Sequence, residues 1–361
     1  MKHIISKSCA DAQAYIVPFR AGSPRSVSIV PEIDAAVDLA INGSFGGNLG
    51  ETYAMTLPVG DKLTSIILLG LGADKLSVRD IHTKAAQAFK QAKQLGAKHV
   101  AVMLDQVSEL SESFELFGAL ARLPQLVGYT NSGLKSNPEN KSFEQVAFVT
   151  AADGLDAALS EAVATARGTI IARRLCNLRS NEQTPQSLAE DTAALGKEYG
   201  FDVQLFDKAA IEELGMESFL SVARGAHNTP PVLIVMRYLN GGDSPRVGLV
   251  GKGIVYDSGG YSIKTTPGMK NMFDDMGGAA AVIGAMTAVA DQRLRANVIG
   301  VIAACENKIA ADAYVPGDII GSMSGKTIEV ISADAEGRLT LADAVTYIQR
   351  KESCRFVAAD K

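Results

Sequence analysis

Apolar segments alternate with longer amphipathic segments along the first part of the chain. A continuous apolar run covers residues 64–72, an amphipathic stretch follows over 78–96, and a second apolar run covers 98–104. Short apolar runs bounded by turn residues favour strands, whereas apolar residues three or four positions apart favour a helix. This order of strand, helix and strand predicts an α/β fold.

The second part of the chain contains a denser series of apolar runs. Strands are predicted over 202–206, 231–239, 246–253, 296–305 and 326–332. Their near-continuous apolar character is typical of strands that are covered on both faces. Helices are predicted over 277–294 and 338–351. Because ligands bind beyond the carboxyl ends of the strands in such sheets, the segments that follow these strands are the candidate functional segments.

Several features between the two series predict how the chain is divided. A polar stretch over 130–145 predicts a loop, 146–150 predicts a short strand, and an Ala-rich helix is expected from about 155 to 175. Thr184 followed by Pro185 predicts a helix start. A chain of 361 residues favours two domains. We expect an N-terminal α/β domain over 1–150, a connecting helix over 151–177 and a second domain over 178–361.

Composition and charge narrow the class of protein. Hydrophobic residues make up 47% and charged residues 21%, as in soluble globular proteins. The net charge of −5 argues against a nucleic-acid partner, because phosphate binding needs clustered Lys and Arg. No apolar run approaches the roughly 20 residues of a membrane-spanning helix, and the N-terminal segment lacks the apolar core of a signal peptide. The scattered cysteines, Cys9, Cys176, Cys305 and Cys354, fit reduced thiols in a cytoplasm and exclude a cysteine-cluster zinc site.

The segment "VGKGIVYDSGGYSIK" (250–264) places two charged residues near the end of a predicted buried strand. An isolated buried charge is costly, so Lys252 and Asp257 need partners there. "MFDDMGG" and "SADAEGR" fall at the same edge of the predicted sheet and add further carboxylates. The candidate carboxylates are Asp257, Asp274, Asp275, Asp334 and Glu336.

Carboxylates packed this closely predict bound cations. In an extended chain Asp334 and Glu336 would share one face, together with Arg338. Such like charges repel one another unless positive charge lies among them, and two divalent ions would supply it. An oxygen-rich donor set without His suits Zn²⁺, Mn²⁺, Mg²⁺ or Co²⁺. Lys252 could join only as the neutral amine, with a pKa far below the usual value of about 10.4.

Each feature also has an ordinary interpretation. An Asp-x-Glu pair in a loop is usually a solvated turn, a Lys usually extends to the surface, and paired glycines mark tight turns. The Gly-Leu-Gly turn at 70–72 lacks the third Gly of a dinucleotide site, so a strand-to-helix turn is favoured there. The coincidence of three charged segments at the strand ends of one sheet favours a two-metal hydrolase.

Four segments resemble the leucyl aminopeptidase family, the cytosolic two-metal exopeptidases that include peptidase B. They are "VGKGIVYDSGGYSIK", "MKNMFDDMGGAAAV", "SGKTIEVISADAEGRLTLADAV" and, more weakly, "CNLRSNEQTPQSLAE". The resemblance covers residues 175–345, and the first domain matches only in general character. It implies two domains, each a mixed sheet flanked by helices, with the catalytic domain C-terminal. It also implies a cytoplasmic metalloaminopeptidase that releases leucine-like N-terminal residues from peptides.

The resemblance assigns the metal ligands residue by residue. Asp257 and Glu336 would bridge two divalent metal ions, with Mn²⁺ or Zn²⁺ expected and Mg²⁺ or Co²⁺ as alternatives. Asp334 would hold one metal through its side chain and carbonyl. Lys252 and Asp275 would complete the other site. The glycines around these residues would let the backbone pass close to the metals.

The resemblance also implies roles around the metals. Lys264 would polarise the scissile carbonyl or stabilise the oxyanion, and Arg338 would hold a bicarbonate-like anion that acts as general base on a metal-bridging water. Met272 would line the pocket for the N-terminal side chain. Ser332 stands where the family usually has Asn, which changes the reach of a substrate-pocket hydrogen bond. Asp274 receives no role.

Family members continue beyond the point where this sequence stops, with segments that finish the sheet and line the pocket. The resemblance implies a hexamer for a complete chain. For this short chain we expect smaller oligomers and weak peptidase activity. The alternatives are a catalytically impaired binding or assembly protein, DNA binding, which the acidic net charge disfavours, and a two-metal phosphatase. Only Lys264 and Arg338 would mark a phosphate clamp.

Overall fold

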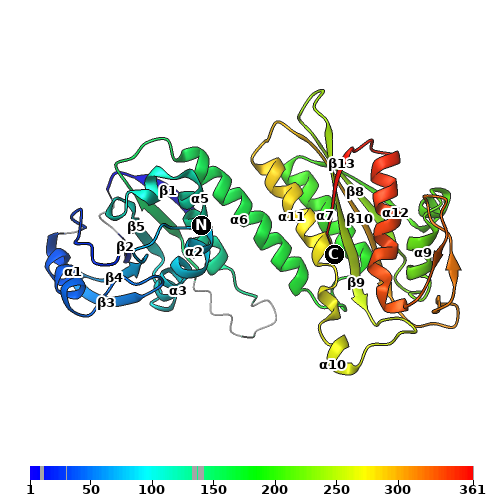
Figure 1. The fold of residues 1–361 in the computed structure, drawn as a ribbon, viewed down its shortest axis with the longest axis horizontal. Coiled ribbons are helices and arrows are strands. Elements are labelled where there is room, and N and C mark those ends of the chain that lie inside the picture. Colours follow the sequence, from blue (N-terminus) through cyan, green and yellow to red (C-terminus); the bar gives the residue numbers. More distant parts are fainter. Residues whose placement is uncertain (9–11, 30, 132–135, 137–141, 361) are drawn as a thin grey trace. The chain divides into compact units, whose positions relative to one another are not determined.

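The structure is a computed structural model that describes residues 1–8, 12–29, 31–131, 136 and 142–360. The chain divides into two compact units, residues 1–166 and 167–361. Helix α6 (Asp156–Asn177) begins in the first unit and ends in the second, as Figure 1 shows. None of the helices that these residues form combines the length and apolar character that crossing a bilayer requires.

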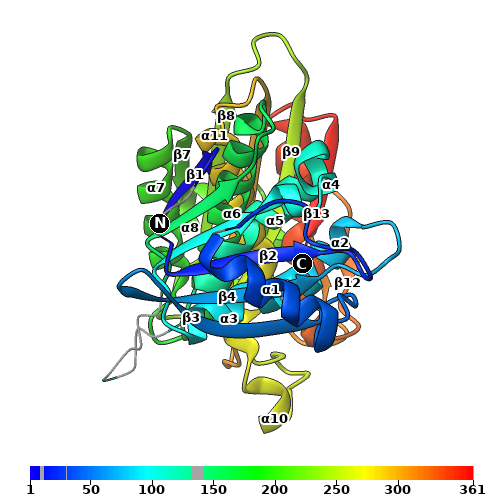
Figure 2. The same ribbon diagram turned by 90° about the vertical axis from the view of Figure 1, so that its left-hand side faces the viewer.

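The first unit contains a six-stranded sheet in the order β1-β6-β5-β2-β4-β3, in which only β3 runs antiparallel to its neighbour. Its strands are β1 (Lys2–Ser6), β2 (Ala14–Phe19), β3 (Thr52–Val59), β4 (Lys62–Gly70), β5 (His99–Met103) and β6 (Gln145–Val149). Its helices are α1 (Pro31–Gly43), α2 (Val78–Asp80), η1 (Ile81–Ala85), α3 (Ala86–Gln94), η2 (Leu104–Gln106), α4 (Glu109–Glu112) and α5 (Phe114–Gly128). Figure 2 views this unit with β2 and α1 toward the reader.

Alternate residues of its strands enter two separate apolar clusters. Ile16 and Ile67 pack with α3 and α5, whereas Val17 and Ile66 pack with α1. This alternation follows from the two-residue period of a strand and covers both faces of the sheet. The predicted strands and helix of this unit are confirmed, and the structure adds β1, β2 and β3, for which no strand was predicted.

The second unit contains a five-stranded sheet in the order β13-β9-β10-β8-β7. Its strands are β7 (Asp202–Phe206), β8 (Val232–Leu239), β9 (Arg246–Asp257), β10 (Asn297–Asn307) and β13 (Phe356–Asp360). Strands β13, β9 and β10 are parallel, and β8 and β7 continue the sheet in antiparallel pairs. Both sheets are therefore mixed and flanked by helices, which confirms the predicted fold class.

Helices cover both faces of this second sheet (Figure 1). The helices are α7 (Pro185–Tyr199), α8 (Lys208–Glu213), α9 (Glu217–Ala223), α10 (Thr266–Met269), η3 (Met272–Asp274), α11 (Gly277–Asp291), η4 (Ala333–Ala335) and α12 (Glu336–Arg350). One apolar cluster joins α9 and α12 to the sheet through Val250 and Ile254. The other joins α7 and α11 through Val255 and Ile302. The predicted start of α7 is confirmed, because the Thr184 hydroxyl accepts a hydrogen bond from the Ser187 backbone N–H.

The strand predicted over 326–332 is wrong as a member of the main sheet. Only β12 (Ile328–Glu329) forms there, and it pairs with β11 (Ile319–Ile320) in a separate two-stranded ribbon. Ile331 is 77% exposed, so this segment lacks the cover that a central strand would receive. The apolar run leads into η4 instead, which carries the chain back to the end of β9.

A close approach of backbones positions the loop before α11. A Cβ atom at Gly251 in β9 would lie 2.6 Å from the carbonyl oxygen of Gly278 in α11. Any larger residue would push the helix away from the strand. Because both positions are Gly, the start of α11 and the preceding turn η3 lie directly against β9, beside its charged end.

Candidate metal centre

Three segments deliver charged side chains to the carboxyl end of β9. Lys252 lies within β9, and Asp257 is its last residue. Asp275 follows η3, which packs against β9. Asp334 lies in η4, and Glu336 begins α12. The structure therefore brings together the five residues for which a metal-binding role was predicted.

Two ammonium groups lie among these carboxylates. The Lys252 Nζ atom is 2.7 Å from an oxygen of Asp275 and 2.7 Å from an oxygen of Glu336. The Lys264 Nζ atom is 2.6 Å from Asp257 Oδ2 and also contacts Asp334 Oδ1. One oxygen from each of Asp257, Asp334 and Glu336 lies within 4.8 Å of the others. The carboxylates thus form a single cluster.

Negative charge exceeds positive charge in this cluster, because four carboxylates face two ammonium groups. The side chains of Asp257 and Glu336 are 3% and 1% exposed, so water screens them poorly. Burial, with the negative charges of Glu336 and Asp257, raises the pKa of Asp275 to about 6 despite Lys252. Burial lowers the pKa of Lys252, but Asp275 and Glu336 raise it more, so its pKa lies above the ordinary value.

The cluster fits divalent cations on its own chemistry. Glu336 Oε2 is buried and has no hydrogen-bond partner among the described residues. A buried carboxylate oxygen without a partner carries a large desolvation cost, which a bound cation would remove. The donors are carboxylate oxygens and, once Lys252 has lost its proton, one amine, without His or Cys, and hard to borderline divalent ions accept that set.

The local conformation around Asp334 and Glu336 differs from the prediction. We expected these residues to share one face of an extended chain. Instead Asp334 lies in the 3₁₀ turn η4 and Glu336 starts a helix. The hydroxyl of Ser332 accepts a hydrogen bond from the Asp334 backbone N–H, which caps this turn. The tight turn, rather than strand alternation, brings both carboxylates to the cluster.

The remaining predicted residues surround the cluster in different ways. Asp274 is exposed and is not one of the clustered carboxylates. Met272 is half-buried in η3. Arg338 is exposed and makes no hydrogen bond or ion pair with the part of the chain that the structure describes, so its guanidinium is available to an anion.

Two residues that the sequence did not single out support the site. Asn307, at the end of β10, donates a hydrogen bond of 2.7 Å to Asp257 Oδ1. The Arg179 guanidinium lies over the Phe273 ring, 4.1 Å from its centroid, and so braces η3. The role of Asn307 follows from the strand register that pairs it with Asp257, which no sequence pattern displays. No sequence pattern marked Arg179 either.

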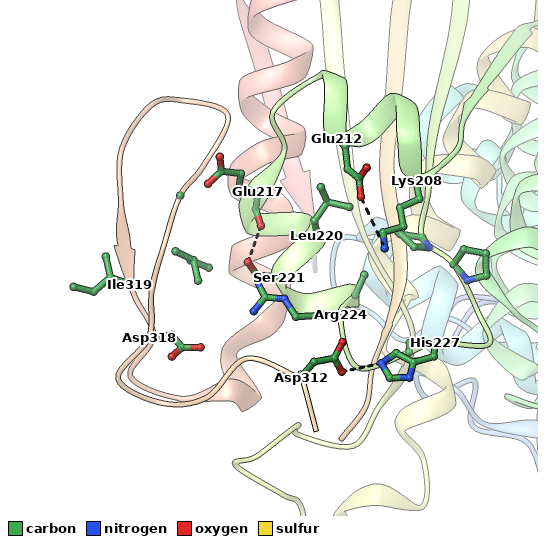
Figure 3. A pocket seen from close by; sticks show the side chains of 16 residues that line it. Lys208, Glu212, Glu217, Leu220, Ser221, Arg224, His227, Asp312, Asp318 and Ile319 are labelled. Carbon is green, nitrogen blue, oxygen red and sulfur yellow. Dashed lines mark hydrogen bonds and ion pairs between the residues drawn. The ribbon is translucent and has the colours of Figure 1, made fainter. Parts of the chain in front are cut away.

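A groove of about 690 Å³ lies elsewhere in the second unit (Figure 3). Its walls come from α8, α9 and the segment 312–321, and an ion pair of 2.8 Å joins His227 to Asp312 within it. Its lining contains none of the predicted site residues. The groove and the carboxylate cluster are therefore separate features.

Comparison with known protein families identifies both parts of the chain. Residues 170–359 match the catalytic domain of the cytosol aminopeptidase family, and residues 34–138 match the N-terminal domain of the same family. The first match contains every clustered carboxylate and both lysines.

Individual proteins give the same result. A probable cytosol aminopeptidase of Clostridium perfringens is 41% identical over 367 residues, which cover 97% of this chain and 72% of that protein. One of Fusobacterium nucleatum is 41% identical over 314 residues, covering 87% of this chain and 63% of the relative.

Solved structures share the fold. A mutant of tomato leucine aminopeptidase has a TM-score of 0.86 at 27% identity, covering 99% of this chain and 72% of that one. The bottromycin maturation enzyme BotP in complex with Mn has a TM-score of 0.78 at 26% identity, covering 94% and 70%. With both domains matched, this chain belongs to the cytosol aminopeptidase family.

Proposed function

We propose that this chain is a metal-dependent aminopeptidase that releases leucine-like residues from the N-termini of peptides. The observation that carries the proposal is the cluster of four carboxylates and two lysines at the end of β9, in which Asp257 and Glu336 are buried. Membership of the cytosol aminopeptidase family supports peptides as substrates and a cytoplasmic location. The solved structure of BotP in complex with Mn supports a metal cofactor.

The clustered side chains would hold two divalent ions, Mn²⁺ or Zn²⁺, with Mg²⁺ or Co²⁺ as alternatives. Asp257 and Glu336 would bridge the pair, Asp334 would complete one site, and Lys252 and Asp275 the other. When bound, such ions supply Lewis acidity toward the scissile carbonyl and make water a competent nucleophile at neutral pH. The excess negative charge of the cluster would be neutralised by the ions.

The other residues act on the substrate and on protons. The Lys264 ammonium would donate to the oxygen that becomes negative as the peptide bond is attacked. Arg338, exposed at the start of α12, would hold a bicarbonate-like anion that accepts a proton from water. Met272 would contact the N-terminal side chain of the substrate, and Ser332 would line the same pocket. The free α-amine of the substrate would bind in the cluster, which restricts cleavage to the first peptide bond.

Two other hypotheses, a catalytically impaired protein and a phosphatase, have less support than a peptidase. A catalytically impaired protein would not need all five predicted ligands, and each is present and clustered. A homo-oligomer, with a hexamer as the family pattern, remains a prediction. No observation favours a phosphatase over a peptidase.

Hydrolysis of a panel of aminoacyl-anilides tests the proposed function. The metal-free chain is assayed alone and after addition of Mn²⁺ or Zn²⁺, with N-acetylated substrates as controls. We expect turnover of leucine-anilide only with metal, and none of the acetylated compound. Equal cleavage of both compounds would show that the free α-amine is not recognised, and no turnover with any metal would refute the proposal.

A further inference from the structure

Asn307 links two segments that deliver metal ligands. It ends β10 and is fully buried, and the strand register pairs it with Asp257. Its side-chain amide donates to Asp257 Oδ1 at 2.7 Å and to the carbonyl oxygen of Ala333 at 2.9 Å. Ala333 directly precedes Asp334. A single amide group therefore contacts the end of β9 and the turn η4 that precedes α12.

The chemistry of the two neighbours fixes the orientation of this amide. Both partners are oxygen atoms that can only accept, so both N–H bonds of the Asn307 Nδ2 group must point toward them. The Oδ1 atom then faces the Gly259–Gly260 turn, where it is buried and has no hydrogen-bond partner among the described residues. The structure leaves this acceptor unpaired while keeping both donors engaged.

These hydrogen bonds decide which oxygen of Asp257 faces the cluster. Asp257 Oδ1 accepts from Asn307 and from the Gly259 backbone N–H at 2.8 Å. Asp257 Oδ2 faces the Lys264 ammonium inside the cluster instead. Rotation of the carboxylate would break both donor contacts at once.

We infer that Asn307 is a positioning residue that aligns Asp257 and the Ala333–Asp334 peptide for metal binding. This inference rests on the proposed function, because it names the residue that orients proposed ligands. Groups that hydrogen-bond to ligating carboxylates set their orientation, and their loss typically weakens metal binding about tenfold to hundredfold.

Mn²⁺ binding to Asn307→Asp tests the inference by isothermal titration. Asp has the same size but replaces both donors by an acceptor, so it repels Asp257 Oδ1 and the Ala333 carbonyl. We expect the Kd for Mn²⁺ to rise about tenfold to hundredfold. Asn307→Ser, which is too short to reach either oxygen, should give a similar rise and replaces the first variant if that chain does not fold.

Tyr314→Phe is the matched control. The Tyr314 hydroxyl donates to the same Ala333 carbonyl at 2.8 Å but does not contact Asp257. We expect its Kd to stay within about twofold of wild type, since Asn307 still holds both oxygens. The absorption spectrum of the Co²⁺-loaded chain should change in the Asn307 variants and remain that of wild type in Tyr314→Phe.

Three outcomes would contradict the positioning role of Asn307 or the proposed function on which it rests. An unchanged Kd in an Asn307 variant that unfolds as cooperatively as wild type would overturn the positioning role. Equal weakening in Tyr314→Phe would transfer the role to the Ala333 peptide alone and overturn the claim for Asp257. If the wild-type chain itself bound no Mn²⁺, the proposed function would fail before the variants were compared.

Discussion

At the scale of single residues, the candidate metal centre depends on which charged side chains lie next to one another. Lys252 and Lys264 each lie between two carboxylates, yet the proposal gives them different tasks. Lys252 is nearly enclosed, with Asp275 and Glu336 around it. Lys264 lies in the loop after β9, between Asp257 and Asp334, and the proposal directs it to the substrate. This difference predicts different consequences when each environment is changed.

Lys264→Ala should lower kcat while the chain keeps its metal. Removing one donor to a developing oxyanion typically costs about 10²–10³ in kcat. We expect KM for leucine-anilide and the Mn²⁺ content to change by about twofold or less, because Lys264 is not a proposed ligand. Lys270→Ala, an exposed change in the same loop, is the control and should retain full activity. Loss of metal in parallel with kcat would show a structural role instead.

Gly337→Ala should disturb Lys252 without unfolding the helix. A Cβ atom at Gly337 would lie 2.5 Å from Lys252 Cε and 2.9 Å from its Nζ. Ala favours a helix over Gly by roughly 0.5–1 kcal/mol, so the fold itself should not suffer. The displaced amine should raise the Kd for Mn²⁺ about tenfold.

The control for this variant is Gly277→Ala in α11, where an added Cβ meets no atom within 4 Å. Isothermal titration should give wild-type affinity for the control. Unchanged Mn²⁺ affinity in Gly337→Ala would mean that Lys252 is not a ligand.

The sequence could predict the clustered side chains but not their supporting contacts. Asp257 stands out because it follows a buried apolar run, and Asp334 and Glu336 because they follow an apolar run that resembles a strand in the sequence. Asn307 does not stand out, because its role depends on the register of β10 against β9, which no local pattern encodes. The turn η4 was also missed, because an apolar run before Asp334 suits a strand and only the cap at Ser332 marks the turn.

At the scale of elements, α12 carries both a proposed ligand and a cap for a neighbouring helix. Asp343 is fully buried and accepts hydrogen bonds from the backbone N–H groups of Phe219 in α9 and Met323. The N-cap residue of α9, Met216, makes no side-chain hydrogen bond to the start of that helix. Asp343 of α12 therefore caps the start of α9. The same contact holds α12, which begins at Glu336, against α9.

Asp343→Ala should destabilise the chain. It leaves the buried Phe219 N–H without a partner, at a cost of about 1–3 kcal/mol, and the part-buried Met323 N–H at a smaller cost, so the free energy of unfolding should decrease by at least about 1–3 kcal/mol. Urea titration measures this, with the exposed loop change Asp243→Ala as the control. A decrease in Asp343→Ala no larger than in the control would show that water replaces the carboxylate.

The effect of Asp343→Ala on the free energy of unfolding should depend on pH. Burial raises the pKa of Asp343, so the folded chain binds a proton there more readily than the unfolded chain. Stability from this group is therefore greatest at low pH and decreases as pH rises through the raised pKa. The stability difference between wild type and Asp343→Ala should narrow as pH rises from the ordinary Asp value toward neutrality.

Element prediction succeeded where burial alone decided the pattern. Strand β7 (Asp202–Phe206) and the start of α11 at Gly277 agree with the predicted bounds, because turn residues mark their ends. β9 continues four residues beyond its predicted end, to Asp257, because two glycines and a Lys hid the strand pattern. The charged segments near the cluster do not follow the rule that buried strands are apolar. The ends of such strands can therefore be located only from the tertiary structure.

At the scale of the whole molecule, each unit has its own apolar clusters, and the proposed metals bind only the second. In scanning calorimetry, Mn²⁺ should therefore raise the unfolding temperature of the second unit and leave that of the first unit unchanged. Saturation at 100 times the Kd corresponds to about 2.7 kcal/mol for each bound ion. Chelation should reverse the shift. Equal shifts of both transitions, or a single transition, would show that the units unfold together.

Counting bound Mn²⁺ by electron paramagnetic resonance tests the central claim most directly. The metal-free chain is titrated with Mn²⁺, and the six-line signal of free Mn²⁺ is followed. The two-metal account predicts that this signal stays weak until two equivalents per chain have been added, since the cluster offers two sites. A free signal that grows from the first addition, or after one equivalent, would contradict the proposal that these carboxylates and lysines form a two-metal peptidase centre.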